Sequence, residues 1–462
     1  MSIRKKLFGD RAFYKMVLGV AVPIMIQNGI TNFVGLLDNI MVGRVGTEQM
    51  SGIAIVNQLL LVFNLAIFGA ISGAGIFSAQ FYGCGDHKGV RHTFRFKAYI
   101  CTLLLAVGVL IFVLFGRELI LMYLHGEDNQ AALEAALHYG EQYLWVMLIG
   151  LLPFAVEQLY TSTLRECGET VVPMTAGVTA VLVNLVLNYL LIFGSLGFPK
   201  LGVAGAAIAT VISRYVQAAV VVIWTHTHSA KMPFVKGVYG SLRVPSHLAG
   251  QIVVKGAPLM VNEIIWASGV AILMQCYSIR GLDTVAAMNI STTISNLFNV
   301  VFIAMGSAIS IIVGQLLGAG KMEEAKDTDF KLIAFSIMSC IVIGGALAVM
   351  APLFPMLYNT TAEVKALAAW FLRIAALCMP IAGFIHASYF TLRSGGKTII
   401  TFLFDSVFLW CVSIPVAFVL SRYTGMPIVP LYLSIQLLDL IKCVIGFILV
   451  KKGVWLNNIV AV

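Results

Sequence analysis

Charged residues are scarce in this sequence. Only 11% of its 462 residues are Asp, Glu, Lys or Arg, whereas 60% are hydrophobic and the mean hydropathy is +0.94. Soluble domains carry about 25% charged residues, so the composition excludes a soluble globular protein. The formal net charge is +9, but no basic helix or groove-sized domain accompanies it, and we expect no nucleic-acid partner.

Clustered cysteine and histidine are also missing. The eight cysteines are scattered and none forms Cys-x-x-Cys, which predicts free thiols and no disulfide framework or metal centre. The chain has no H-E-x-x-H, G-x-S-x-G or paired-aspartate motif within its apolar runs. An intramembrane enzyme would need such a nucleophile or metal set. We therefore expect no enzymatic activity and no cofactor.

Long hydrophobic runs, by contrast, recur along the whole chain. Roughly 20 apolar residues cross the ~30 Å hydrocarbon core of a bilayer as a helix, whereas a barrel would show alternating ten-residue strands. We predict an all-α integral membrane protein with twelve transmembrane helices, at residues 16–43, 51–79, 94–115, 139–163, 171–195, 203–226, 250–277, 285–313, 329–352, 366–392, 398–420 and 428–450.

Lysine and arginine are divided unequally between the two sides of this arrangement. The side that holds the N-terminus carries 21 of the 30 basic residues and the other side carries 6, while three fall within spans. Because cytoplasmic loops carry the excess of positive charge, we expect both termini to be cytoplasmic, in a multi-pass protein of the cell (inner or plasma) membrane.

The two halves of the chain repeat each other. When the chain is aligned with itself so that Pro23 meets Pro258, polar and glycine positions of the first half meet identical residues without a gap: Gln80 and Gln315, Gly83 and Gly318, Gly85 and Gly320. Apolar composition does not explain these matches. Six spans per repeat give both repeats the same orientation. We predict two six-helix bundles, 1–226 and 250–462, related by a pseudo-two-fold axis along the membrane normal and joined by a cytoplasmic linker, 227–249.

Carboxyl groups inside the spans are the first candidates for function. Asp38 lies in the first span among Leu37, Ile40 and Met41. A charged side chain at the bilayer centre costs about 2.5–3.5 kcal/mol on insertion scales, so it is a functional candidate by default. The alternative is an acid that reaches the outer interface or bonds a neighbouring helix, since the helix must end by Gly46.

Two amides in the fifth span complement this acid. Asn184 and Asn188 are four residues apart and therefore share one helix face. With Asp38 they would offer the hard oxygen ligands of a Na⁺ site, and Asp38 without sodium would be a proton site. The alternative is a pair of interhelical hydrogen bonds, worth about 0.6 kcal/mol each.

The second half carries its own polar set. Asn262 and Glu263 fall near mid-membrane in the seventh span, three to four residues before Trp266. An acid beside an aromatic ring suits an organic cation, through charge and cation–π contact, although a glutamic acid bonded to another helix is the alternative. Asp405 and His386 are further candidates for lining a cavity in this half.

One further acid in the second half has a basic neighbour. Asp439 precedes Lys442 by three residues, and this spacing predicts an ion pair on one helix face.

Three stretches carry a family resemblance: the first span with Pro23, Asp38 and Gly43-Arg44-Val45-Gly46, the turns TLRECGE and TLRSGGK that end spans four and ten, and NEIIW in span seven. With them the chain resembles the multidrug and toxic compound extrusion (MATE) family of cation-coupled efflux transporters over nearly its whole length. The resemblance implies a V-shaped pair of six-helix bundles that open alternately to each side.

The resemblance also implies roles for particular residues. It assigns the N-terminal cation site to Asp38, Asn184 and Asn188. A fourth-helix polar residue often joins this site in the family, and here Glu157-Gln158 stands where Asn is more usual. Glu263 is the nearest match to the acid that some members carry in the C-terminal lobe.

We therefore expect a secondary antiporter that exports organic cations or other amphipathic compounds in exchange for Na⁺ or H⁺ by alternating access. We expect it to act as a monomer in the lipid bilayer. The alternative is a flippase for a lipid-linked saccharide precursor of the same superfamily, which would need arginines for the pyrophosphate. The spans hold only Arg214 and Arg373.

Overall fold

The structure is a computed structural model that describes residues 8–43, 46–124 and 130–461. The side chains of residues 34, 36–40, 42, 43 and 47 also lie outside this description. Throughout the described residues the elements are helices and no strand is present. Helices suit an apolar chain in lipid because each satisfies its backbone hydrogen bonds within its own segment.

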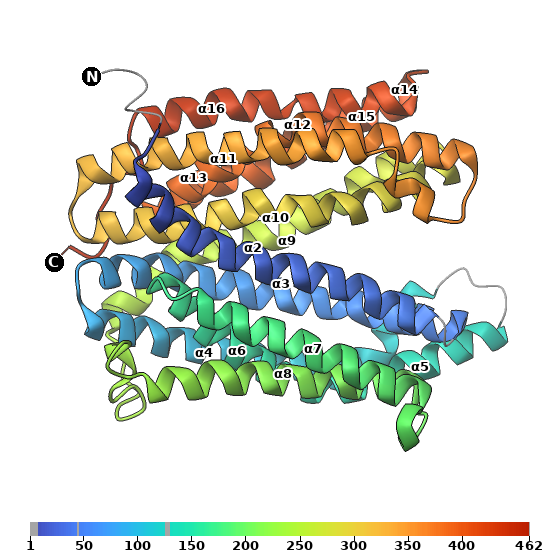
Figure 1. Cartoon of the computed structure of the whole chain (residues 1–462), viewed down its shortest axis with the longest axis horizontal. Helices are drawn as coiled ribbons and strands as arrows, with labels where there is room; N and C mark the ends of the chain where they lie inside the picture. Colours follow the sequence, from blue (N-terminus) through green and yellow to red (C-terminus); the bar gives the residue numbers. More distant parts are fainter. Residues whose placement is uncertain (1–7, 44–45, 125–129, 462) are drawn as a thin grey trace. The chain divides into compact units, whose positions relative to one another are not determined.

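The described residues of the first half form seven α-helices, of which two together make one span (Figure 1): α2 (Arg11–Gly43), α3 (Thr47–Gly83), α4 (His87–Tyr123), α5 (Gln130–Ile149), α6 (Leu151–Glu166), α7 (Val171–Phe193) and α8 (Gly202–Thr227). Helices α5 and α6 meet at Gly150 with a bend of 46°. The predicted span 139–163 is therefore a broken helix.

The second half forms four long helices and two composite spans: α9 (Ser246–Ser278), α10 (Leu282–Gly318), α11 (Met322–Met350), α12 (Ala362–Ser394), then α13 (Thr398–Phe402) to α14 (Ile414–Tyr423), and α15 (Ile428–Leu437) with α16 (Asp439–Lys451). By length and composition the described residues hold eleven membrane-spanning helices, and the bent pair α5–α6 makes the twelfth. The predicted all-α fold with twelve spans is confirmed.

The span between α13 and α14 contains two π-helical turns, η4 (Leu403–Val407) and η5 (Leu409–Ser413). A π turn replaces the i→i+4 hydrogen bonds by wider i→i+5 bonds, and such turns occur frequently at functional sites. Asp405 lies in η4. Hydropathy carries no signal for this change of helix type.

The helices pack into two compact units. The N-terminal unit comprises Ile26–Ser78 and His87–Ile252, and the C-terminal unit comprises Val253–Val462 together with Met1–Met25 and Ala79–Asp86. The C-terminal unit thus includes the start of α2 and the end of α3. The predicted boundaries at 226, 249 and 250 stay a prediction.

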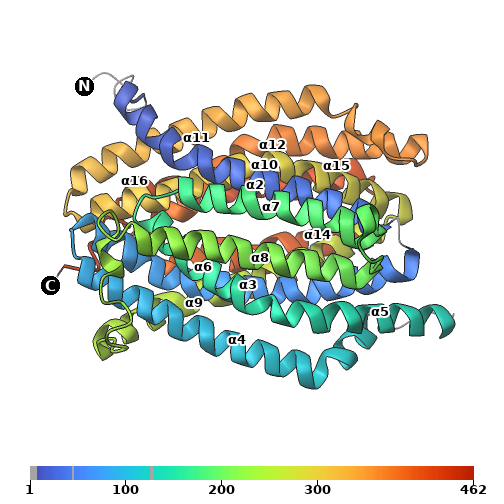
Figure 2. The ribbon, with the colours of Figure 1, turned by 60° about the horizontal axis from the view of Figure 1, so that its bottom comes forward.

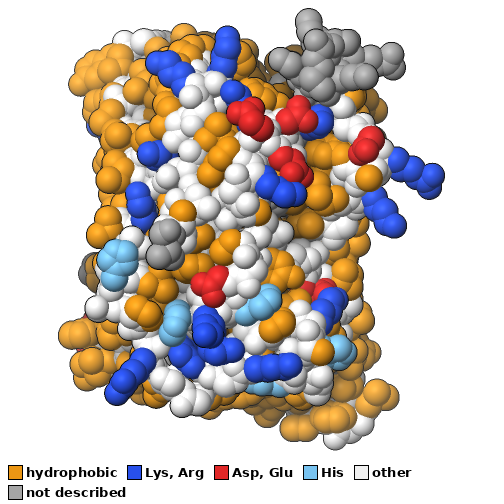
Figure 3. All heavy atoms as spheres, turned by 90° about the vertical axis from the view of Figure 1, so that its left-hand side faces the viewer, with side chains coloured by type: hydrophobic (Ala, Val, Ile, Leu, Met, Phe, Trp, Pro, Cys, Tyr) orange, Lys and Arg blue, Asp and Glu red, His pale blue; other side chains and the backbone are white. Residues whose placement is uncertain are grey.

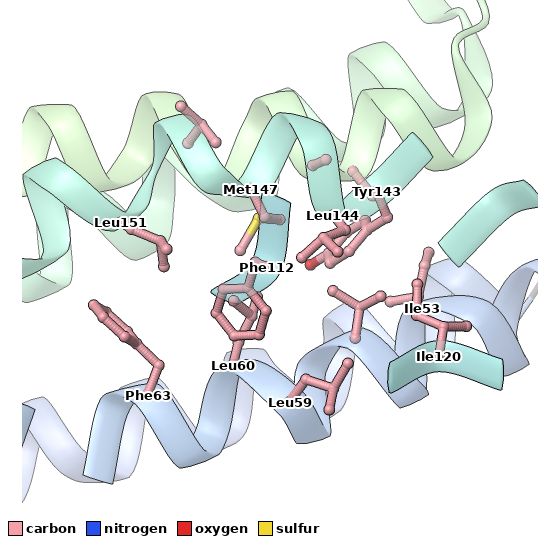
Figure 4. Close-up of a cluster of buried hydrophobic side chains, with 14 of the residues drawn as sticks. Ile53, Leu59, Leu60, Phe63, Phe112, Ile120, Tyr143, Leu144, Met147 and Leu151 are labelled. Atoms are coloured by element: carbon pink, nitrogen blue, oxygen red, sulfur yellow. The ribbon is translucent and has the colours of Figure 1, made fainter. Parts of the chain in front are cut away.

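In the N-terminal unit, α8 packs against α5, α6 and α7, and its place beside α7 is visible in both ribbon views (Figures 1 and 2). The core lies between α3 and the broken span. Leu60 and Phe63 of α3 point toward Met147 and Leu151 in Figure 4, and all four side chains are buried. Because lipid tails are as apolar as these side chains, van der Waals packing rather than exclusion from water holds the helices together here.

In the C-terminal unit, α12 is the central helix. It packs against α10, α11 and α16 (Figure 1). One core cluster joins Met305 and Ile309 of α10 to Leu392 of α12, and Val17 of α2 completes it. Trp455, which follows α16, is fully buried in the same cluster.

The segment after α8 is held on α4. The Arg95 guanidinium donates to the carbonyl oxygens of Val238 at 2.8 Å, Gly237 at 2.8 Å and Arg243 at 3.3 Å. The Tyr99 hydroxyl donates to the carbonyl of Leu242 at 2.5 Å. Basic side chains are prominent on the face shown in Figure 3. The hydrogen bonds of Arg95 and Tyr99 therefore pack the predicted linker on α4.

The internal repeat is visible in the backbone. Gly85 and Gly320, which the repeat pairs with each other, both adopt positive φ angles, +78° and +74°. Glycine populates this region at no steric cost, whereas L side chains rarely do. The same type of turn therefore ends α3 and α10.

Candidate functional site

The two asparagines of α7 belong to a buried polar set in the N-terminal unit. The Asn188 amide donates to the side-chain oxygen of Asn184 at 3.1 Å, and the Asn184 amide donates to the Thr210 hydroxyl of α8 at 3.3 Å. Asn184 is 6% exposed and Asn188 is 2% exposed. The predicted shared face of the two amides is confirmed, and Thr210 is a partner that sequence reasoning missed.

Asp38 lies within α2, but its side chain is outside the described residues. Its assignment to a cation site with Asn184 and Asn188 stays a prediction. The same helix is anchored three turns earlier, where Gln27 accepts a hydrogen bond from Arg165 at 2.5 Å. Arg165 belongs to the first Thr-Leu-Arg turn, so this turn ties α6 to the helix that carries Asp38.

Glu157 of α6 is a fully hydrogen-bonded acid. It is 3% exposed and accepts from Thr161 at 2.7 Å, from Gln158 at 2.9 Å and from Gln217 of α8 at 3.0 Å. Gln217 was not a sequence candidate, because nothing in its span marks it. Thr161, four residues after Glu157 on the same helix, was detectable by spacing.

The two polar sets of the N-terminal unit contact the same helix at different heights. Thr210 bonds Asn184, and Gln217, seven residues further along α8, bonds Glu157. Seven residues of α-helix correspond to about 10 Å. The assignment of Glu157 and Gln158 to the same cation site as the asparagines stays a prediction.

A second polar set lies in the C-terminal unit. Asn262 of α9, 2% exposed, donates to Asp405 at 3.2 Å and to the Tyr389 hydroxyl at 3.5 Å. Its side-chain oxygen accepts from Ser406 at 2.6 Å. Asn262 and Asp405, candidates from two distant spans, are therefore brought together, with Ser406 and Tyr389 as partners that the sequence did not reveal.

Lys442 of α16 joins this set to Asp439. Its ammonium nitrogen lies 3.7 Å from the Oδ1 of Asp439 and 3.5 Å from the Oδ1 of Asp405. The predicted Asp439–Lys442 pair is confirmed, but the closer partner, Asp405, was not foreseen. Helical spacing revealed the first partner, whereas the second depends on how α16 packs beside η4.

The other candidates of the second half, Glu263, Trp266 and His386, make no hydrogen bond to Asn262 or Asp405 within the described part of the chain. Glu263 is half-buried on α9 and within electrostatic range of Asp405 and Arg393. Trp266 is 41% exposed. The His386 ring lies 4.5 Å from the ring of Phe302, and its Nδ1 lies 3.2 Å from the carbonyl oxygen of Ala382. Their assignment to substrate binding stays a prediction.

Metal ligation can be judged from the donor groups of the described residues. No group of three or more His, Cys, Asp or Glu side chains in this part of the chain is arranged to hold a metal ion. The donors that do converge are amide and hydroxyl oxygens with single carboxylates, which suit hard cations such as Na⁺.

Comparison with known proteins identifies relatives along almost the whole chain. A probable multidrug resistance protein NorM of Thermotoga maritima is 24% identical over 415 residues, which cover 88% of this chain and 86% of the relative. A probable multidrug resistance protein YoeA of Bacillus subtilis is 26% identical over 422 residues, with 89% and 88% covered.

Solved structures agree with this similarity in fold. A multidrug resistance MATE family transporter of the MOP superfamily, described in an outward-facing conformation, superposes with a TM-score of 0.85 at 18% identity, and 99% of each chain is covered.

The family model MatE matches the chain twice, at residues 23–190 and 258–419. The first match begins at Pro23 and the second at Pro258, which are the duplicated prolines of the internal repeat. The chain belongs to the MatE family.

Proposed function

We propose that this multi-pass membrane protein is a secondary antiporter that exports organic cations and other amphipathic compounds in exchange for Na⁺ or H⁺. The observation that carries the proposal is the double family match on a chain whose two units each hold a buried polar set inside the spans. The names of the relatives, which are multidrug resistance proteins, support the same substrate class.

In the proposed mechanism, Asp38 takes the coupling ion from outside with help from Asn184 and Asn188. Neutralising Asp38 removes a charge from within the first span and lets the N-terminal bundle repack, which releases the exported compound outward. Ion and compound then share one conformational equilibrium and need not share a site.

The driving force is sufficient for export. One elementary charge gains about 2.3 kcal/mol per 100 mV of membrane potential, which sustains a concentration gradient of roughly fiftyfold. We place the protein in the cell membrane with both termini cytoplasmic, and we assign it no enzymatic activity.

The flippase alternative has less support. Its pyrophosphate substrate needs arginines free to bind it, but the Arg214 guanidinium lies 5.1 Å from the Phe154 ring centroid and donates to the Gly150 carbonyl at 3.3 Å. Arg373 lies 5.1 Å from the ring centroid of Trp370, whose exposed fraction of 50% is that of a peripheral residue.

Efflux of ethidium from proteoliposomes tests the proposal, with Na⁺ and H⁺ gradients imposed separately. We expect one of the gradients to drive efflux in the wild type and Asp38→Asn to abolish it. Asp283→Asn is the matched control, because Asp283 is exposed in the first turn of α10. Gradient-driven efflux by a folded Asp38→Asn protein would refute the role of Asp38, and no efflux by the wild type under either gradient would refute the antiporter.

A further inference from the structure

The ammonium group of Lys442 is surrounded by the groups that bind organic cations. Two carboxylates, Asp405 and Asp439, lie within 3.7 Å of its nitrogen, and the Phe408 ring centroid lies 5.3 Å away. A cation over an aromatic face is attracted by the ring quadrupole. Two acids here share one lysine, and the lysine side chain is 10% exposed.

The nitrogen–oxygen distances of Lys442 are longer than those of a hydrogen-bonded ion pair. Its two nitrogen–oxygen distances are 3.5 and 3.7 Å, whereas the other ion pairs in the described part of the chain lie between 2.5 and 3.0 Å. Charge-assisted hydrogen bonds normally measure about 2.7–2.9 Å. The ammonium is therefore held by charge without tight hydrogen bonds, which is suited to exchange.

The main carboxylate is positioned independently of the lysine. Asn262 donates to the Oδ2 of Asp405, while Lys442 faces its Oδ1. Asn262 is itself fixed by Ser406, whose hydroxyl lies within hydrogen-bond distance of its side-chain oxygen, at 2.6 Å, and of its backbone carbonyl, at 3.0 Å. A polar group that orients a ligating carboxylate is typical of a binding site.

One turn of α16 away from Lys442, a buried serine hydroxyl has no hydrogen-bond partner among the described residues. Ser388 of α12 is fully buried, and its Oγ has no hydrogen-bond partner among the described residues. It lies opposite Gly446, four residues after Lys442 and hence one turn along the same face of α16. A buried hydroxyl without a partner is unfavourable unless a ligand uses it.

We propose that the position of the Lys442 ammonium is a binding site for the protonated amine of an organic cation, and that Lys442 occupies this site between substrates. The site prefers a primary ammonium group on an unbranched alkyl chain, because that is the group it holds now. Its part in export rests on the proposed function, but the binding step needs neither a gradient nor transport.

A lysine truncation provides a direct test in the full-length protein in lipid nanodiscs. Lys442→Ala removes a three-carbon chain that ends in an ammonium, and n-propylammonium has the same shape. We expect n-propylammonium to raise the thermal unfolding midpoint of Lys442→Ala saturably, because a ligand that binds only the folded state stabilises it. The apparent dissociation constant should be at least tenfold lower than for the wild type.

Three controls separate this site from general effects. n-Propanol, the uncharged analogue, should not reproduce the shift, and the double variant Lys442→Ala/Asp405→Asn should lose it. Lys231→Ala is the matched lysine control, because Lys231 also pairs with an acid, Glu169, and lies over an aromatic ring but is 60% exposed. Equal binding by Lys231→Ala, or by the wild type, would overturn the proposal.

A second variant covers the case in which Lys442→Ala does not fold. Lys442→Leu keeps an apolar side chain out to the δ carbons and lacks the last carbon with its nitrogen. It should bind methylammonium and reject n-propylammonium. Failure of folded Lys442→Leu to bind methylammonium would refute the site, while normal gradient-driven ethidium efflux by the wild type would leave the antiporter function intact.

Discussion

Two acids within the spans, the buried Glu157 and the half-buried Asp405, differ in how many hydrogen bonds the surrounding side chains give them. The Glu157 carboxylate accepts three hydrogen bonds within its own unit. Asp405 accepts one hydrogen bond from the Asn262 amide, and the Lys442 ammonium lies 3.5 Å from it. A satisfied network stabilises one arrangement of the helices, while a loosely held charge is available to a ligand. At the scale of single residues, Glu157 therefore has the stronger structural role.

We predict that Glu157→Gln lowers the stability of the protein. The amide turns at least one acceptor into a donor and faces it toward another donor, and an unsatisfied buried group costs about 1–3 kcal/mol. Thermal unfolding in detergent should show a lower midpoint. Glu134→Gln, at an exposed position of α5, should leave the midpoint unchanged. Equal midpoints for the two variants would contradict the prediction.

At the scale of helices, α3 and α10 cross at their ends with backbone in contact. A Cβ built on Gly318 would collide with the backbone of Gln80, and one built on Gly83 would collide with the backbone of Gln315. Neither neighbour can move away as a flexible side chain would, because both are main chain. Glycine at these two positions sets how closely the helices approach.

We expect Gly318→Ala to destabilise the crossing, since overpacking of a filled contact costs about 1–3 kcal/mol. Gly19→Ala is the control, because a Cβ at Gly19 meets nothing within 4 Å and alanine favours a helix over glycine by roughly 0.5–1 kcal/mol. The unfolding midpoint should fall for the first variant and hold or rise for the second. A Gly318→Ala protein as stable as the wild type would show that the crossing is not tight.

At the scale of the whole chain, residues near the C-terminus close over the end of α3. The Gln80 amide donates to the carbonyl oxygens of Ser394 at 2.9 Å and Asn457 at 3.2 Å, and its oxygen accepts from the backbone of Ile459 at 2.9 Å. Asn458 donates to the carbonyl of Gly318 at 3.1 Å. One buried glutamine of the first repeat thus holds the C-terminal tail of the chain.

We predict that Gln80→Ala and removal of residues 457–462 are energetically coupled. Both changes remove the hydrogen bonds that join Gln80 to Asn457 and Ile459, so the double variant should lose clearly less stability than the sum of the single losses. The thermal unfolding midpoints of the wild type, the two single variants and the double variant measure this coupling as a double-mutant cycle. Additive losses would indicate that glutamine and tail act independently.

Hydropathy and the internal repeat predict much of this fold, but they do not predict contacts between distant helices or local changes in helix geometry. Features that depend on local spacing can be read directly from the sequence. They are the twelve spans, the shared face of Asn184 and Asn188, and the Asp439–Lys442 pair. The contacts Glu157–Gln217 and Asp405–Lys442 depend on helix rotation and depth, which apolar composition leaves open. The bend at Gly150 and the π turns near Asp405 change the backbone hydrogen bonding without changing hydropathy.

The crossing of α3 and α10 has a consequence for the origin of the chain. Gln80 touches Gly318 and Gln315 touches Gly83, and each member of one contact is the duplicate of a member of the other. This is an isologous contact, which a two-fold axis produces when two identical surfaces meet. In a protein with a single repeat, the same surface would join two copies as a homodimer. Because both repeats lie in one polypeptide, their association does not depend on protein concentration, and each repeat carries a polar set of its own.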